Sequence, residues 1–159
     1  MNAPANRELI EGFYRAFQRR DGEAMAACYA ADATFRDPVF DLRGARIGAM
    51  WKMLCSRGAD LRVEFAGLVS DDSSASADWQ AWYTFSGTGR QVHNVIRARF
   101  RLADGMIAQH IDEFDFWRWS RQALGPPGLL LGWTPMLRGK VRAQAAQALD
   151  RFIATHGAA

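Results

Sequence analysis

The sequence predicts an α+β fold in which three N-terminal helices pack on a curved antiparallel sheet and a helical extension follows. Up to about residue 58 the apolar residues recur at helical spacing, whereas from residue 60 they alternate with polar residues, as in half-buried strands. Beyond residue 117 three prolines interrupt an apolar stretch, so that stretch cannot form one continuous helix. We therefore expect one domain over residues 1–124, with residues 125–159 packed on it.

The N-terminal part predicts three helices. Asn6 is a suitable N-cap for a helix over residues 6–20, and Asp21 can cap a second helix that carries Tyr29. Gly44 opens a third helix, which Gly58 ends. The apolar positions that define these helices are Leu9, Ile10, Phe13, Tyr14, Phe17, Met25, Cys28, Ile47, Met50, Trp51 and Leu54. Three helices are thus expected before any long strand.

From residue 60 onward we expect a meander of antiparallel strands. The first two strands carry alternating apolar residues at Leu61, Val63 and Phe65, and at Trp79, Ala81, Tyr83 and Phe85. The turn SGTGR leads to the strand QVHNVIRARFRL, and the turn ADG leads to the last strand, MIAQHIDEFDFW. Alternate residues share a face of the sheet. The side chains expected on the inner face are Val92, Asn94, Ile96, Ala98, Phe100, His110, Asp112 and Phe114.

Three arginines, Arg97, Arg99 and Arg101, fall on the outer face, where Glu113 and Asp115 on the neighbouring strand are suitable ion partners. We interpret this face as solvent-exposed or as a dimer contact, and expect a homodimer. No aromatic residues lie between the arginines to stack on bases, and the net charge of +3 comes from charges spread over the chain. Nucleic acid is therefore not an expected partner.

Composition and motifs exclude several other classes of function. No stretch approaches the roughly 20 apolar residues that span a bilayer, and the N-terminus lacks the apolar core of a signal peptide. We expect a cytoplasmic protein with no membrane partner. Cys28 and Cys55 lack metal-type spacing, so both are interpreted as reduced thiols and no metal is expected. The SGTGR turn joins two strands, which is not the place of a phosphate loop, so no cofactor is expected.

The segment YAADATFRDPV, after two helices and before a third helix and the meander, resembles the NTF2-like superfamily. Within it, the SnoaL-like polyketide cyclases and the ketosteroid isomerases are the most similar, over about residues 6–124. The resemblance implies a cone formed by the curved sheet and the helices, with an apolar pocket that binds a small hydrophobic molecule.

Asp37 falls where ketosteroid isomerases keep their general base. Those enzymes also need a tyrosine and a protonated aspartate to stabilise the enolate oxygen, and these positions read Phe13 and Ala98 here. Steroid isomerase activity itself is therefore not expected. SnoaL-like cyclases resemble this chain in another respect. They use an acidic residue on a late strand for acid/base work, helped by a histidine, and Asp112 and His110 are the candidates for these two roles. Limonene epoxide hydrolases use an arginine between two aspartates, but Arg97 and Arg99 point outward.

The candidate catalytic residues are Asp37, His110 and Asp112, and the candidate substrate-binding residues are Phe13, Trp79, Tyr83, Asn94 and Phe114. Each has a structural alternative: Asp37 before Pro38 also suits a turn, His110 and Asp112 can satisfy each other, and the aromatic residues can be core. The expected function is acid/base catalysis of the isomerase, cyclase or hydrolase type on a hydrophobic carbonyl or polycyclic compound. The alternative is a module that only binds a hydrophobic ligand or dimerises.

The apolar segment GPPGLLLGWTPML, residues 125–137, is expected to be buried, because so much exposed apolar surface favours aggregation. One possibility is a lid over the pocket, held down by a helix over residues 138–155. The other is a contact with a second subunit.

Overall fold

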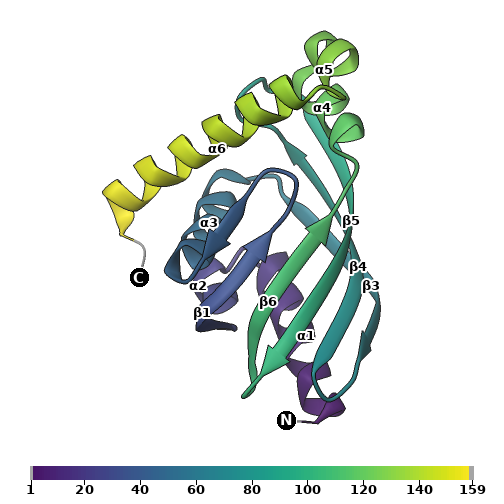
Figure 1. The fold of residues 1–159 in the computed structure, drawn as a ribbon, viewed down its shortest axis with the longest axis vertical. Helices are drawn as coiled ribbons and strands as arrows, with labels where there is room; N and C mark the ends of the chain where they lie inside the picture. Colours follow the sequence, from purple (N-terminus) through teal and green to yellow (C-terminus); the bar gives the residue numbers. More distant parts are fainter. Residues whose placement is uncertain (1, 158–159) are drawn as a thin grey trace.

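The computed structural model describes residues 2–157 and has a six-stranded, curved sheet that wraps around three N-terminal helices (Figure 1). The strands are β1 (Tyr29–Arg36), β2 (Asp41–Arg43), β3 (Arg62–Ser70), β4 (Ser74–Thr84), β5 (Gln91–Ala103) and β6 (Met106–Glu113), in the order β2-β1-β6-β5-β4-β3. The helices are α1 (Ala3–Gln18), α2 (Gly22–Ala26), α3 (Ala45–Arg57), α4 (Phe116–Leu124), α5 (Pro126–Leu131) and α6 (Pro135–His156). The predicted α+β class with a curved sheet is confirmed, but the sheet is not wholly antiparallel as predicted, because β1 pairs parallel with β6.

Helix α1 begins earlier than its sequence pattern suggests. Its N-cap is Asn2, whose side chain accepts a hydrogen bond from the Ala5 N–H, with a proline in the first turn. The prediction of Asn6 as the N-cap is wrong. Asn6 is buried inside the helix, and its side-chain amide donates to the Asp71 carbonyl at 2.9 Å. It therefore ties α1 to the turn between β3 and β4 instead of starting the helix.

The segment after α2 forms strands that the sequence pattern hides. Helix α2 is capped by Asp21 as predicted but ends at Ala26, and Tyr29 already belongs to the eight-residue strand β1, so the expectation of three helices before any long strand is wrong. Strand β1 pairs parallel with β6, and the register shifts between Tyr29 and Thr34. Because of this irregularity, β1 does not show simple alternation along its length. Its pairing brings Tyr29 beside the candidate site on β6.

The meander of β3 to β6 follows the prediction, including the turn at Asp104 and Gly105, which both take positive φ angles. The register places Ala98 opposite Asp112 and Phe100 opposite His110 on the inner face. On the outer face Arg99 pairs with Glu113, but Arg97 pairs with Asp78. The expectation that Asp115 lies on this face is wrong. Asp115 instead caps α4, where its side chain accepts a hydrogen bond from the Arg118 N–H.

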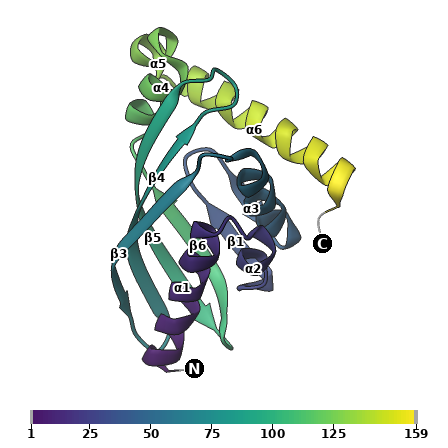
Figure 2. The same ribbon diagram turned by 180° about the vertical axis from the view of Figure 1, so that it is seen from behind.

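The C-terminal extension is the part that departs most from expectation. Helix α6 crosses the open end of the cone and packs against α3, as Figures 1 and 2 show from opposite sides. The residues expected to be buried between 125 and 137 are instead exposed on the single chain, with Leu130 at 68% and Trp133 at 74%. Within residues 2–157, none of the helices has the length and hydrophobicity needed to cross a membrane.

Candidate functional site

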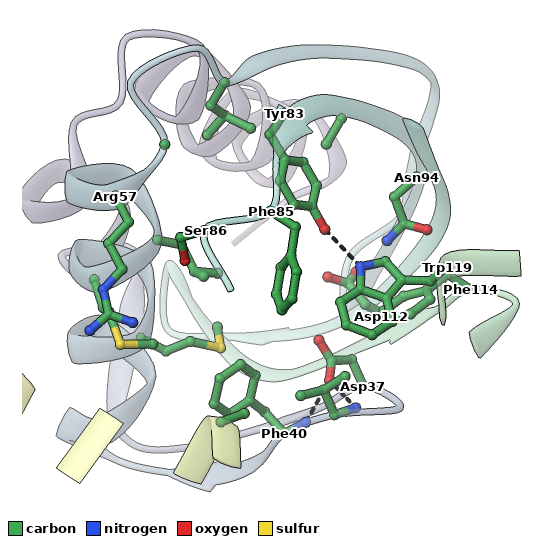
Figure 3. Close-up of a pocket in the computed structure, with 18 of the residues that line it drawn as sticks. Asp37, Phe40, Arg57, Tyr83, Phe85, Ser86, Asn94, Asp112, Phe114 and Trp119 are labelled. Carbon is green, nitrogen blue, oxygen red and sulfur yellow. Dashed lines mark hydrogen bonds between the residues drawn. The ribbon is translucent and has the colours of Figure 1, made fainter. Parts of the chain in front are cut away.

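A cavity of about 380 Å³ lies inside the cone, between the inner face of the sheet, α3 and α6. This volume suits a small molecule, and most of the lining side chains are apolar. Figure 3 shows Asp37, Asp112, Asn94 and Trp119 on one side of the cavity and Arg57 on the other. Most of the polar site residues that the sequence predicts therefore line this one cavity.

Asp37 follows β1 in a tight turn. Its Oδ1 accepts hydrogen bonds from the backbone N–H groups of Val39 and Phe40, at 2.7 and 2.6 Å. The turn role considered for this residue is therefore correct, but the same carboxyl also lines the cavity. One carboxyl oxygen serves the turn, and in residues 2–157 no side-chain or backbone group donates to the other. The local turn holds the acid in place while leaving an oxygen for a ligand.

Burial raises the pKa of Asp37 from 3.8 to about 7, although the two backbone hydrogen bonds act in the opposite direction. The negative charge of Asp112 raises this pKa further, and Arg142 lowers it. The two carboxyl groups are thus close enough to interact. At neutral pH Asp37 populates both its protonated and its ionised forms, which is the property of an efficient general acid/base.

We expect this raised pKa to appear in the pH dependence of stability. Between pH 3.8 and about 7, the folded chain keeps the Asp37 proton that the unfolded chain releases, so stability falls as the pH rises through this window. The loss is on the order of 4 kcal/mol at 1.36 kcal/mol per pKa unit. Asp37→Asn should lack this loss, so its stability relative to the wild type should increase with pH. Urea unfolding of both proteins at several pH values measures the difference, and a constant difference would refute the raised pKa.

Behind the cavity, a chain of buried hydrogen bonds ends at Asp112. The Trp51 indole N–H donates to the Tyr29 hydroxyl at 2.9 Å, and this hydroxyl lies 2.7 Å from His110 Nδ1. His110 Nε2 lies 2.8 Å from Asp112 Oδ1, and the Trp79 N–H reaches the same oxygen at 3.3 Å. His110 and Asp112 therefore contact each other. The sequence places both side chains on the inner face of one strand, where they can satisfy each other.

One tautomer of His110 gives every group in this chain a partner. An indole N–H can only donate, so the Tyr29 oxygen accepts from Trp51. With the His110 proton on Nε2, Nδ1 accepts the Tyr29 hydroxyl hydrogen and Nε2–H donates to Asp112. This tautomer positions the Asp112 carboxyl group.

His110 itself does not reach the cavity. It is fully buried, both ring nitrogens are engaged, and the rings of Phe13, Phe35 and Phe100 surround it at centroid distances of 5.8, 5.0 and 4.2 Å. The internal-pair alternative thus describes the geometry of His110, whereas Asp112 lines the cavity. Phe13 is also placed behind the site and is not among the lining residues, while Trp79 and Phe114 are lining residues.

Tyr83 and Asn94 supply neutral hydrogen-bonding groups to the cavity. The Trp119 indole N–H donates to the Tyr83 hydroxyl at 2.8 Å, which leaves the hydroxyl hydrogen free for another acceptor. Burial raises the Tyr83 pKa to about 12, so this hydroxyl stays protonated at neutral pH. The side-chain amide of Asn94 makes no hydrogen bond within the described residues. Both groups can therefore bind a carbonyl oxygen of a ligand.

Three aromatic residues of the site were missed at the level of sequence: Tyr29, Trp51 and Trp119. Trp119 lies on α4, within the predicted domain of residues 1–124 and before the segment that was expected to cover the pocket. A usable signal was the spacing of Phe116, Trp119 and Ala123, which are the buried face of an amphipathic helix. Among the described residues, no group of three or more His, Cys, Asp or Glu side chains could hold a metal ion.

Comparison with known proteins agrees with this architecture. The family model of the SnoaL-like domain matches residues 10–110. Curated protein sequences give no match. Solved structures do match: an LEH-like epoxide hydrolase of M. tuberculosis is 19% identical with a TM-score of 0.65, over 80% of this chain and 94% of that chain.

Two further structures are similar over comparable lengths. A proposed polyketide cyclase from Pseudomonas putida is 23% identical, with a TM-score of 0.62 over 74% of this chain and 97% of that chain. An NTF2-like protein from Burkholderia xenovorans is 14% identical, with a TM-score of 0.64 over 77% of this chain and 98% of that chain. At these identities the likeness supports the fold and leaves the chemistry to the residues of the cavity.

Proposed function

The chain belongs to the SnoaL-like domain family, and we propose that it catalyses proton transfer on a hydrophobic carbonyl or polycyclic compound bound in the cavity. The observation that carries this proposal is the pairing of an acid that titrates near neutral pH with neutral donors in one apolar cavity. Asp37 has a pKa of about 7, and Tyr83 and Asn94 line the same cavity. Perturbed acids in apolar pockets are frequent at catalytic sites.

In this mechanism Asp37 is the base. Its carboxylate removes a proton from the carbon next to the carbonyl, and the C–H electrons form a C=C bond while the carbonyl oxygen becomes negative. Tyr83 and Asn94 donate hydrogen bonds to that oxygen, as an oxyanion site does. Return of this proton from Asp37 to a conjugated carbon completes an isomerisation. If the protonated Asp37 first exchanges its proton with solvent, the return of a solvent proton, or of a deuteron in D₂O, to the original carbon completes an exchange.

Asp112 and His110 support this reaction without transferring the proton themselves. His110 holds the Asp112 carboxylate through Nε2, and the charge of Asp112 raises the pKa of Asp37. Asp112 therefore makes Asp37 a stronger base. The arginine-between-aspartates arrangement of limonene epoxide hydrolases finds no support, because Arg97 and Arg99 lie exposed on the outer face in ion pairs.

The alternative function is a module that binds a hydrophobic ligand without changing it. The observation that favours it is the internal use of His110, which spends both ring nitrogens on Tyr29 and Asp112. Binding alone needs the apolar walls and the Tyr83 and Asn94 donors, but it does not need an ionisable Asp37.

An exchange experiment separates the two functions. The probe is 2-tetralone, a bicyclic ketone with acidic protons next to its carbonyl, dissolved in D₂O with the purified protein. We expect the protein to accelerate the replacement of these protons by deuterium, followed by proton NMR, and to bind the ketone in a parallel fluorescence titration. Binding without accelerated exchange would support the binding module and contradict the catalytic proposal.

A further inference from the structure

The extension carries an exposed apolar surface that the cavity does not explain. Six of the nine large apolar side chains that are exposed in residues 2–157 lie between positions 117 and 136. We call them the apolar tip: Trp117, Leu129, Leu130, Leu131, Trp133 and Met136. The three most exposed are Leu130, Trp133 and Met136, at 68%, 74% and 73%. Large exposed apolar patches mark protein or membrane interaction sites.

The outward orientation of the apolar tip is fixed by packing and hydrogen bonds. Gly128 and Gly132 turn toward α4, where an added Cβ would lie 1.9 Å from the Ser120 carbonyl oxygen and 2.0 Å from Ser120 Oγ. The small residues of this segment thus face inward and the leucines outward, the reverse of an ordinary surface helix. The Trp117 N–H donates to the Leu129 carbonyl and the Trp133 N–H to the Leu130 carbonyl, at 3.2 and 3.0 Å. These bonds hold the outward arrangement.

Cations accompany the tip without acidic partners. Between residues 116 and 149 the sequence has five Lys or Arg residues and no Asp or Glu. Beside α4 a surface hollow is lined by Arg90, Gln91, His93, Arg118, Arg121 and Gln122. None of its arginines forms a salt bridge within the described residues. The Arg121 guanidinium lies 4.1 Å from the centre of the Trp117 ring, so the arginine hollow adjoins the apolar tip.

We infer that the apolar tip and the arginine hollow form a docking surface for an anionic lipid bilayer. Leucine and tryptophan side chains partition into the interface of a bilayer, and lysine and arginine beside them are attracted to anionic headgroups. A second copy of the chain fits less well, because a twofold contact centred on the tip would oppose the same five cations. RNA would neutralise the arginines but leave the leucines exposed. The expectation of no membrane partner rested on the lack of a membrane-spanning stretch and of a signal-peptide core, and neither observation excludes this surface contact.

The docking surface lies next to the cavity. Helix α6 starts at the tip with Met136, and Val141 on the same helix already lines the cavity, roughly 8 Å further along at 1.5 Å per residue. A bilayer bound at the apolar tip would therefore lie near the end of the cavity that α6 crosses. The docking inference does not depend on whether the cavity catalyses a reaction, and its test uses no substrate.

Co-sedimentation with vesicles tests the inference. The full chain should sediment with phosphatidylcholine vesicles that contain phosphatidylglycerol, much less with phosphatidylcholine alone, and progressively less as salt is added. Lys140→Gln should weaken the partition about fivefold, as expected for one cation near an anionic surface. Leu130→Glu should weaken it at least about tenfold, because it removes an apolar contact and adds a repelled charge. Val69→Glu is the matched control, since Val69 is 65% exposed on β3.

Several outcomes would overturn the inference. These are the absence of sedimentation with anionic vesicles at low salt, equal binding to both vesicle types, and an equal effect of Leu130→Glu and Val69→Glu. A dimer that forms without lipid and is lost in Leu130→Glu would assign the tip to a second copy instead. Binding of RNA that survives Leu130→Glu and is lost in Arg118→Gln, without vesicle binding, would assign the hollow to nucleic acid. Thermal unfolding of each variant confirms that the fold is intact.

Discussion

Asp37→Asn should slow the exchange of 2-tetralone protons by about 100- to 10,000-fold, the range that a positioned general base contributes. Asparagine keeps the side-chain oxygen that accepts from Val39 and Phe40, so the turn should stay intact. It cannot take up a proton at neutral pH. The loss should therefore appear in the exchange rate, while the dissociation constant of the ketone changes little.

The matched control is Asp32→Asn, which changes an exposed carboxyl on β1 and should leave the rate unchanged. In the wild type the exchange rate should rise as the pH passes through about 7, because only the ionised form of Asp37 is a base. The variant should lack this step. A variant that keeps the wild-type rate and pH profile would move the role of base to Asp112 or exclude this chemistry.

The inner face of the sheet was predictable because its geometry is local. Side chains in a strand alternate, so the pattern from Val92 to Phe100 and the hairpin at Asp104 determine that His110 and Asp112 point inward. Tyr83 and Asn94 could be placed on the cavity wall by the same rule. Asp37 could be assigned both a turn and a pocket role, and its geometry combines the two.

Contacts between distant elements were not predictable in this way. Tyr29 was assigned to a helix, because the irregular pairing of β1 with β6 breaks the alternation that identifies a strand. Its contact with His110 joins residues 81 positions apart. The inward position of Gly128 and Gly132 in and after α5 was also not predicted. Glycine is needed at these positions only because α4 packs closely against them, and this contact is not visible in the local sequence. The predicted homodimer stays a prediction. The arginines on the outer face of the sheet form ion pairs within one chain, and these pairs do not test whether a second chain binds there.

The hydrogen-bond chain behind the cavity leads to the second large effect, on stability. His110→Leu should lower the free energy of unfolding by roughly 3 to 5 kcal/mol, although leucine has a suitable size and polarity for an apolar core. The substitution removes the acceptor of the Tyr29 hydroxyl and the Nε2 donor to Asp112, and both groups are buried. A buried polar group without a partner costs about 1 to 3 kcal/mol, and a buried charge costs more.

The matched control is His93→Leu. His93 also lies on a strand and bonds one side chain, Gln80, at 2.7 Å, but it is partly exposed and stacks on Trp82. Its loss should cost about 1 kcal/mol or less, because water can replace the lost partner. Urea unfolding measures both variants at pH 7.

Tyr29→Phe separates the hydrogen bonds from the packing of the imidazole. It leaves His110 and its contact with Asp112 in place, but removes the hydroxyl between Trp51 and His110. The Trp51 N–H and His110 Nδ1 then both lack a partner, so we expect a loss of roughly 1 to 3 kcal/mol. Nitrogen-15 NMR of the imidazole gives an independent reading, because the wild-type protein should show a neutral ring protonated at Nε2. A proton found on Nδ1, or His110→Leu and Tyr29→Phe variants as stable as the wild type, would contradict the direction of the chain and its role in holding Asp112.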